Sequence, residues 1–204
     1  MRINKFWKPY RPWHVIGDNG GQVHIDRQWS GLSCVDMKGR SVLDVGCAEG
    51  LVSLKCESEG GASLVHGVEL RPRAVEVARS LAGYSGVSDH VKFFQGDLSN
   101  PEDVLNQTGL RPRYDVVIAN AVIQKVKPKA ARLMDAIMEK ADDLLLIRLP
   151  ERNVQEGRSG RIDPVERAAN AGFEMLWESC GYPKGSPPFP LEGEAWLALF
   201  KRTG

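Results

Sequence analysis

The chain has few of the residues that build metal and disulfide sites. Its 204 residues include four cysteines and four histidines. The cysteines, Cys34, Cys47, Cys56 and Cys180, form no Cys-x-x-Cys pair, and the histidines are scattered along the chain. Because zinc sites and disulfide frameworks need regular spacing of such residues, we expect no bound metal and cysteines that stay reduced.

Long apolar runs are also missing. Runs such as 116–119 and 144–147 suit buried strands and are too short to span a bilayer. The first residues lack the apolar core of a signal peptide, and Pro9 and Pro12 interrupt them. The net charge of +1 gives no general argument for a membrane or nucleic-acid partner. We therefore expect a soluble, cytoplasmic protein.

Residues 1–37 show no clear periodicity, and we expect an N-terminal extension or lid followed by one domain over 38–204. The start of this extension mixes cations with aromatic side chains. Such a mixture stacks bases and neutralises phosphates in some proteins, and in others it pins an arm onto the domain, which we favour here. The residues concerned are Arg2, Lys5, Phe6, Trp7, Lys8, Tyr10, Arg11 and Trp13.

From residue 41 onward, short apolar runs alternate with helical patterns. Apolar strands separated by helices are typical of a parallel, doubly wound α/β sheet that is buried on both faces. Two final strands without a helix between them predict a seven-stranded sheet with an antiparallel last strand. We predict strands at 42–45, 64–69, 91–94, 114–119, 144–149, 173–179 and 194–201, helices at 51–59, 72–82, 128–140 and 163–171, a short helix from 100 and a loop at 150–161.

The first predicted strand ends in an acid and a turn of small residues, Asp-Val-Gly-Cys-Ala-Glu-Gly at 44–50. Ligands of such sheets bind beyond the carboxyl ends of the strands. Gly46 and Gly50 have no β-carbon, which would let a ligand approach the backbone closely. Asp44 stands in an apolar strand and needs a partner to stay ionised, either a ligand ammonium or the amides of the turn.

Two further acids end the second and third strands. Glu69 suits the two hydroxyls of a ribose, although an acid here also favours the start of the next helix. Asp97 suits the exocyclic amine of an adenine, with Leu98 covering the ring, although a loop or capping role is the alternative. A nicotinamide dinucleotide site is disfavoured, because the Gly-x-Gly-x-x-Gly pattern counted from Gly46 would place Leu51 at its last glycine.

These segments resemble the class I S-adenosylmethionine-dependent methyltransferases over residues 38–202. Residues 42–50 look like the family's first motif, 68–70 its ribose-binding acid, 96–98 its adenine-side acid and 114–122 its fourth motif. The resemblance implies a Rossmann-like methyltransferase fold, an enzyme and S-adenosyl-L-methionine as cofactor. The cofactor-binding residues it implies are Asp44, Gly46, Cys47, Ala48, Gly50, Glu69, Leu70, Asp97, Leu98 and Asn120.

The resemblance leaves the methyl acceptor open. Asn120 is not followed by the Pro-Pro-aromatic sequence of many amino-directed DNA methylases. We expect a small-molecule acceptor that carries phosphate or carboxylate groups, with RNA second, because cations crowd the segments around the methyl group. Residues 22–40 also look similar to the lead-in of small-molecule methyltransferases and of tRNA wobble-uridine alkylating relatives. The cations are Arg2, Lys5, Lys8, Arg11, Lys125, Lys127, Lys129, Arg148, Arg152, Arg158 and Arg161.

The sequence assigns no catalytic residue and no oligomeric state. His14, His24 and His66 are candidate bases, and His66 stands in a predicted strand, where a structural role is simpler. A catalytically silent protein that keeps the fold for binding is a further alternative. The retained acids and glycines argue against it.

Overall fold

The computed structural model describes residues 29, 31–149, 154–156, 160–180 and 196–204. In its first part, strands alternate with helices as predicted. The strands are β1 (Ser41–Val45), β2 (Leu64–Glu69), β3 (Val91–Gln95), β4 (Tyr114–Asn120) and β5 (Ala141–Leu149). The helices are α2 (Leu51–Ser58), α3 (Pro72–Tyr84), α4 (Pro101–Leu105), the 3-10 turn η1 (Ile123–Lys125) and α5 (Ala130–Lys140).

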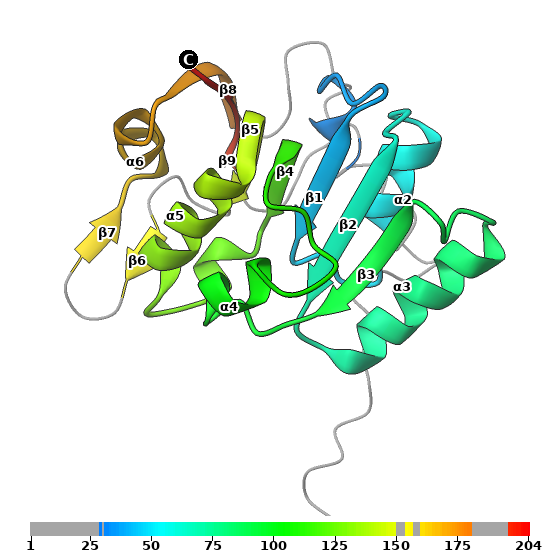
Figure 1. Cartoon of the computed structure of the whole chain (residues 1–204). Coiled ribbons are helices and arrows are strands. Elements are labelled where there is room, and N and C mark those ends of the chain that lie inside the picture. Colours follow the sequence, from blue (N-terminus) through cyan, green and yellow to red (C-terminus); the bar gives the residue numbers. More distant parts are fainter. Residues whose placement is uncertain (1–28, 30, 150–153, 157–159, 181–195) are drawn as a thin grey trace, which may run out of the picture.

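The second part of the chain completes the sheet. The elements are β6 (Val154–Glu156), β7 (Gly160–Ile162), α6 (Pro164–Asn170), β8 (Phe173–Cys180) and β9 (Trp196–Arg202). The central sheet has seven strands in the order β3-β2-β1-β4-β5-β9-β8 (Figure 1). β1 to β5 are parallel, and β9 is antiparallel to both β5 and β8. The predicted doubly wound sheet with an antiparallel last strand is confirmed.

Helices cover both faces of the sheet, α2 and α3 on one and α4, α5 and α6 on the other (Figure 1). The alternation of side chains along a strand divides the core accordingly. In β1, Val42 packs on the α2–α3 side, whereas Leu43 and Val45 pack on the α5 side. The chain runs outward from β1 to β3 and returns to β4 on the other side of β1. The strand order therefore reverses between β1 and β4, where this type of sheet binds ligands.

Two predictions about the elements need correction. The loop predicted at 150–161 contains the antiparallel hairpin β6–β7, in which Val154 pairs with Ile162 and is buried. β5 begins at residue 141 rather than 144, because α5 passes into it directly. Its acids are held by basic side chains of other segments, Asp143 by Arg40 at 2.6 Å and Asp142 by Arg113 at 3.1 Å. A sequence pattern cannot show such distant partners.

The described end of the predicted extension packs onto the domain. Trp29, Leu32, Val35 and Met37 are buried in the core on the α2–α3 side. Residues 1–28, with the aromatic and basic arm, lie outside the described residues, as do Arg152, Arg158 and the stretch 181–195. Across the described ranges, no helix has the length and apolar character needed to cross a membrane.

Candidate functional site

A cavity of about 310 Å³ opens at the carboxyl ends of β1 to β4. Each of these strands contributes the segment that follows it, so residues far apart in the sequence meet there. The volume lies at the lower end of the range of about 300–1,000 Å³ that small-molecule sites occupy. The lining residues are Gly46, Glu69, Leu70, Arg71, Asp97, Leu98, Ser99, Ala121, Val122, Lys125, Val126 and Lys127.

The turn after β1 needs its glycines because of its backbone angles and its packing. Gly46 and Gly50 have φ angles of 82° and 77°, which side chains rarely adopt. A Cβ on Gly46 would lie 2.7 Å from Val122, and one on Gly50 would lie 2.5 Å from Phe93. These glycines therefore let the side chains of Val122 and Phe93 lie close to the backbone, and Gly46 also lines the cavity, where the approach of a ligand stays a prediction.

Glu69 ends β2 and is fixed by three hydrogen bonds. Its Oε2 accepts one from the amide of Ala48 at 3.1 Å. Its Oε1 accepts two from Arg71, one from the backbone amide and one from Nε, each at 3.0 Å. The carboxylate thus connects the turn after β1 with the start of α3 while it lines the cavity. The bond to the amide of Arg71 agrees with the helix-start role, and the cavity agrees with the ribose role.

Arg71 also reaches a second acid. Its Nη2 lies 3.1 Å from Oε1 of Glu49, whose side chain is 3% exposed. Glu49 belongs to the turn after β1, so one guanidinium joins this turn to the tip of β2. Neither Arg71 nor Glu49 was predicted as a site residue from the sequence. The signal was an acid inside the turn and a cation two residues after Glu69, but neither position reveals the contact by itself.

Asp44 lies behind the turn, 1% exposed, and does not line the cavity. Its Oδ2 accepts a hydrogen bond from the hydroxyl of Ser53 in α2 at 2.6 Å. Burial raises the pKa of Asp44 to about 6, the bond from Ser53 opposes the rise, and the charge of Glu69 adds to it. The partner within the described residues is therefore a hydroxyl rather than the amides of the turn, and the ligand ammonium stays a prediction.

Asp97 and two leucines form another part of the wall. Asp97 is exposed, and its Oδ1 accepts a hydrogen bond from the amide of Ser99 at 2.9 Å. Hydrogen bonds from Ser99 lower the pKa of Asp97, which keeps the carboxylate ionised at neutral pH. Leu98 is buried, whereas Leu70 is 53% exposed. An ionised acceptor beside apolar side chains suits a flat ring with an amino group.

The segment after β4 supplies two more cations to the cavity. Lys125 and Lys127 line it, and Ala121 has a φ of 54°, unusual for a residue other than glycine. Burial lowers the pKa of Lys125, the charge of Glu69 opposes this fall, and the charge of Arg71 adds to it. Asn120, just outside the lining, accepts a hydrogen bond from Arg148 of β5 at 3.3 Å. The cavity is therefore lined by both acids and cations, with Arg71 bonded to Glu69 and the charge of Lys125 also acting on Glu69.

The structure divides the ten residues proposed for the cofactor into two groups. Gly46, Glu69, Leu70, Asp97 and Leu98 line the cavity. The others support it from behind: Gly50 packs against Phe93, Ala48 donates to Glu69, Asn120 bonds to Arg148, and Cys47 and Asp44 are buried.

His66 lies away from the cavity. It is 4% exposed in β2, and its Nδ1 is 2.7 Å from the hydroxyl of Tyr114 at the start of β4. Burial and, to a smaller extent, the charges of Lys92 and Arg111 together lower the pKa of His66 to about 4. Burial also raises the pKa of Tyr114 to about 12. The pair is a neutral, structural one, and His14 and His24 lie outside the described residues.

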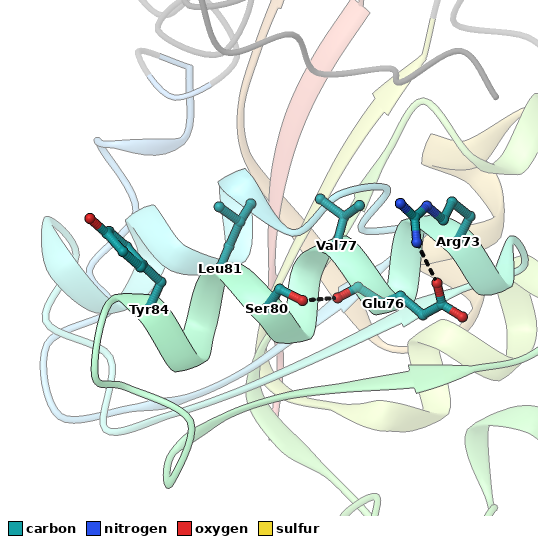
Figure 2. Close-up of a pocket in the computed structure, with 6 residues that line it drawn as sticks. All are labelled: Arg73, Glu76, Val77, Ser80, Leu81 and Tyr84. Atoms are coloured by element: carbon teal, nitrogen blue, oxygen red, sulfur yellow. Dashed lines mark hydrogen bonds and ion pairs between the residues drawn. The ribbon is translucent and has the colours of Figure 1, made fainter.

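A second hollow, of about 350 Å³, runs along the outer face of α3. Figure 2 shows that its side chains project from this one helix, from Arg73 to Tyr84. Its charged groups pair with each other, Arg73 with Glu76 at 2.9 Å, and Tyr84 is 95% exposed. Although it is larger than the cavity at the strand ends, no polar groups from different segments converge on it. We therefore identify the cavity at the strand ends as the candidate site because polar groups from several segments line it, although its volume is smaller.

Comparisons with known proteins identify the family of the chain. A family model described as "Methyltransferase domain" matches residues 36–156, which include the lining of the cavity. The ribosomal protein L11 methyltransferase of Haemophilus influenzae is 31% identical over 96 residues, or 47% of this chain and 29% of that protein. The chain thus spans less than a third of this relative.

Solved structures show the same fold at low sequence identity. A putative RNA methyltransferase from Pyrococcus horikoshii has a TM-score of 0.57 and 21% identity, covering 89% of this chain and 85% of that one. An S-adenosylmethionine dependent methyltransferase from Mesorhizobium loti has a TM-score of 0.62 and 15% identity, covering 87% and 100%. Together with the family model, these matches confirm the family resemblance that the sequence motifs indicated.

Proposed function

The chain belongs to the class I S-adenosylmethionine-dependent methyltransferase family, and on that premise we propose that it methylates a small, anionic acceptor in the cytoplasm. S-adenosyl-L-methionine is the cofactor of this family, as the sequence motifs implied. The observation that carries the proposal is the cavity at the ends of β1 to β4, which is lined by the acids Glu69 and Asp97 and by the lysines Lys125 and Lys127. The free thiols of Cys34, Cys47 and Cys56 suit a reducing compartment.

The cavity residues at the ends of β2 and β3 fit the adenosine part of the cofactor. We assign Glu69 to the ribose hydroxyls, because a carboxylate accepts two hydrogen bonds from vicinal hydroxyls. We assign Asp97 to the adenine amine, and Leu70 and Leu98 to the faces of the ring. Asp44 acts from behind the turn, since a nearby ligand ammonium favours its ionised form. Gly46, Cys47, Ala48, Gly50 and Asn120 shape and support this pocket.

When bound, the cofactor supplies an electrophilic sulfonium methyl group, which passes to the acceptor and leaves S-adenosylhomocysteine. The chain then has to hold the acceptor's nucleophilic atom in line with that methyl group, about 3 Å away. An acceptor that is already anionic at its reacting atom needs no base. An acceptor whose reacting atom carries a proton loses it during the reaction, and a base or water takes the proton up. No described residue in the cavity stands out as that base, which favours catalysis by positioning.

The cations near the cavity support an anionic acceptor. Lys125 and Lys127 line it from the segment after β4, and Arg148 ends β5 beside Asn120. A phosphate or carboxylate on the acceptor would be attracted to this part of the cavity. We expect Lys127→Gln to raise the KM for the acceptor severalfold. Lys129→Gln is the matched control, because Lys129 does not line the cavity and bonds to Asn100 at 3.0 Å.

RNA is the second candidate acceptor. The putative RNA methyltransferase covers most of both chains, and RNA also presents phosphates to basic segments. The curated relative methylates a protein by its name, but its match lies within 96 residues, less than half of this chain. The labelling experiment therefore includes a protein extract among the possible acceptors.

Two measurements test the proposal. Calorimetry with S-adenosylmethionine should show binding. Its absence at millimolar cofactor would favour a catalytically silent protein, and binding of NADH instead would revive the dinucleotide alternative. Transfer of a labelled methyl group into a metabolite extract, total RNA and a protein extract then identifies the acceptor class. Label in the metabolite fraction that persists after nuclease and protease treatment supports a small molecule, whereas label only in RNA or protein contradicts it.

A further inference from the structure

Arg71 occupies a position between two parts of the cofactor cavity that the sequence keeps apart. Its backbone starts α3, where its carbonyl accepts hydrogen bonds from the amides of Ala74 at 3.0 Å and Val75 at 3.1 Å. Its side chain turns back toward the strands, with Nε on Glu69 at 3.0 Å and Nη2 on Glu49 at 3.1 Å. The side chain is 28% exposed and lines the cavity.

The two acids that it joins are both largely buried. The side chains of Glu49 and Glu69 are 3% and 11% exposed. Two carboxylates held against one guanidinium would repel each other without it. Arg71 therefore offsets their repulsion and, with the amide of Ala48, fixes the rotation of the Glu69 carboxylate. A lysine ammonium in its place would lack the planar fork that lets one side chain bond to both acids in fixed directions.

We infer that Arg71 is a positioning residue of the cofactor site, which sets affinity for the ribose by orienting Glu69. Oε1 of Glu69 takes both bonds from Arg71, and Oε2 takes the bond from Ala48. This arrangement fixes the direction of the lone pairs that remain on the two oxygens. The ribose then meets an acceptor that is already oriented, so less conformational entropy is lost on binding. The inference rests on the proposed ribose role of Glu69.

The test uses two probes, S-adenosylhomocysteine and its 2′-deoxyribose analogue, with calorimetry on the full chain. The ratio of their dissociation constants reports the hydroxyl contact alone. We expect wild-type protein to prefer the ribose form at least tenfold and Glu69→Gln to lose most of this preference. Arg71→Met should lose it as well, and Arg71→Lys should retain part of it. Arg73→Met is the matched control, since Arg73 pairs on the outer face of α3 and should keep the wild-type ratio.

The outcomes separate the alternatives. An Arg71→Met variant that weakens both probes equally, or neither, would overturn the positioning role, whatever its effect on stability. If Arg71→Met does not fold, Glu49→Gln gives the same test, because it removes one anchor of the guanidinium and should lower the ratio to a smaller extent. Glu69→Gln with an unchanged ratio would contradict the ribose role itself. Wild-type protein that binds neither probe would overturn the cofactor proposal, and this inference with it.

Discussion

Toward the amino ends of the strands, polar side chains bond to other strands of the sheet, whereas at the carboxyl ends they surround a cavity. Asp115 of β4 accepts bonds from the amide and hydroxyl of Ser41 at 2.8 and 2.6 Å, which joins β4 to β1. The side chain of His66 in β2 also reaches past β1 to the hydroxyl of Tyr114, the first residue of β4. At the other end, Glu69, Asp97 and Lys125 line about 310 Å³ of space.

This difference separates stability from function. A group whose bonds all cross between strands contributes to folding, and its loss should lower stability without changing ligand binding. A group that lines the cavity contributes some stability, but it also presents atoms to a ligand. The comparison predicts that substitutions at the two ends affect different measurements. Four predictions test this, from the largest expected effect to the smallest.

Gly50→Ala should give the largest loss of stability. The new Cβ would lie 2.5 Å from Phe93 at a φ of 77°, so overpacking adds to backbone strain. We expect a loss of about 2–5 kcal/mol in the free energy of unfolding, measured by urea denaturation. Gly86→Ala is the matched control at the amino end of β3. Gly86 has a φ of 72° with open space around it, so only the backbone cost of about 1–2 kcal/mol should appear. Equal losses of unfolding free energy in the two variants would show that the ring of Phe93 moves aside at little cost.

Glu69→Gln and Asp115→Ala should affect different measurements. Glu69→Gln removes a charge-assisted acceptor from the cavity and should weaken S-adenosylmethionine binding by about 1–3 kcal/mol in calorimetry. Asp115→Ala leaves the buried amide and hydroxyl of Ser41 without their acceptor and should lower the unfolding free energy by about 1–3 kcal/mol. Its cofactor affinity should stay that of the wild type. A large loss of cofactor affinity in Asp115→Ala would contradict the prediction that residues at the amino ends of the strands affect stability and not binding.

His66 and Asp44 should change the pH dependence of the unfolding free energy in opposite directions. The folded pKa of His66, about 4, lies below its ordinary 6.5, so its neutral form stabilises the fold above pH 6.5. That contribution is lost as the pH falls from 6.5 to 4. The folded pKa of Asp44, about 6, lies above its ordinary 3.8, so the fold gains stability as the pH falls from 6 to 3.8.

Urea denaturation between pH 7.5 and 4 checks these signs. The stability of wild type relative to His66→Gln should decrease as the pH falls, and that of wild type relative to Asp44→Asn should increase. If the unfolding free energy of wild type and of one variant changes with pH in parallel, the residue replaced in that variant does not contribute to the pH dependence.

Tyr84→Ser should have the smallest effect. Tyr84 is 95% exposed in the hollow on α3, away from the convergent polar groups. We expect the unfolding free energy to change by less than about 0.5 kcal/mol and the cofactor affinity to stay the same. A clear loss of affinity, measured by calorimetry, would show that the hollow on α3 contributes to the site.

Much of this architecture could be predicted from local patterns. The apolar run that ends at Glu69 and the Pro72 that follows it give the boundary between β2 and α3 as the structure has it. The predictions were wrong where distant partners override local composition. The predicted strand began at residue 144, but Asp142 and Asp143 also belong to β5, where they pair with Arg113 and Arg40. The hairpin β6–β7 was missed because its polar strands are only three residues long each.

The sequence by itself determined the parallel sheet and the edge on which Glu69 and Asp97 meet, because the carboxyl ends of parallel strands lie together. Only the tertiary structure decided what each acid bonds to. Glu69 and Glu49 share Arg71, and Asp44 bonds to Ser53, through contacts between segments that the chain brings together only when folded. Hydrogen bonds depend on distances of a few tenths of an ångström and on direction, and residue spacing along a chain specifies neither.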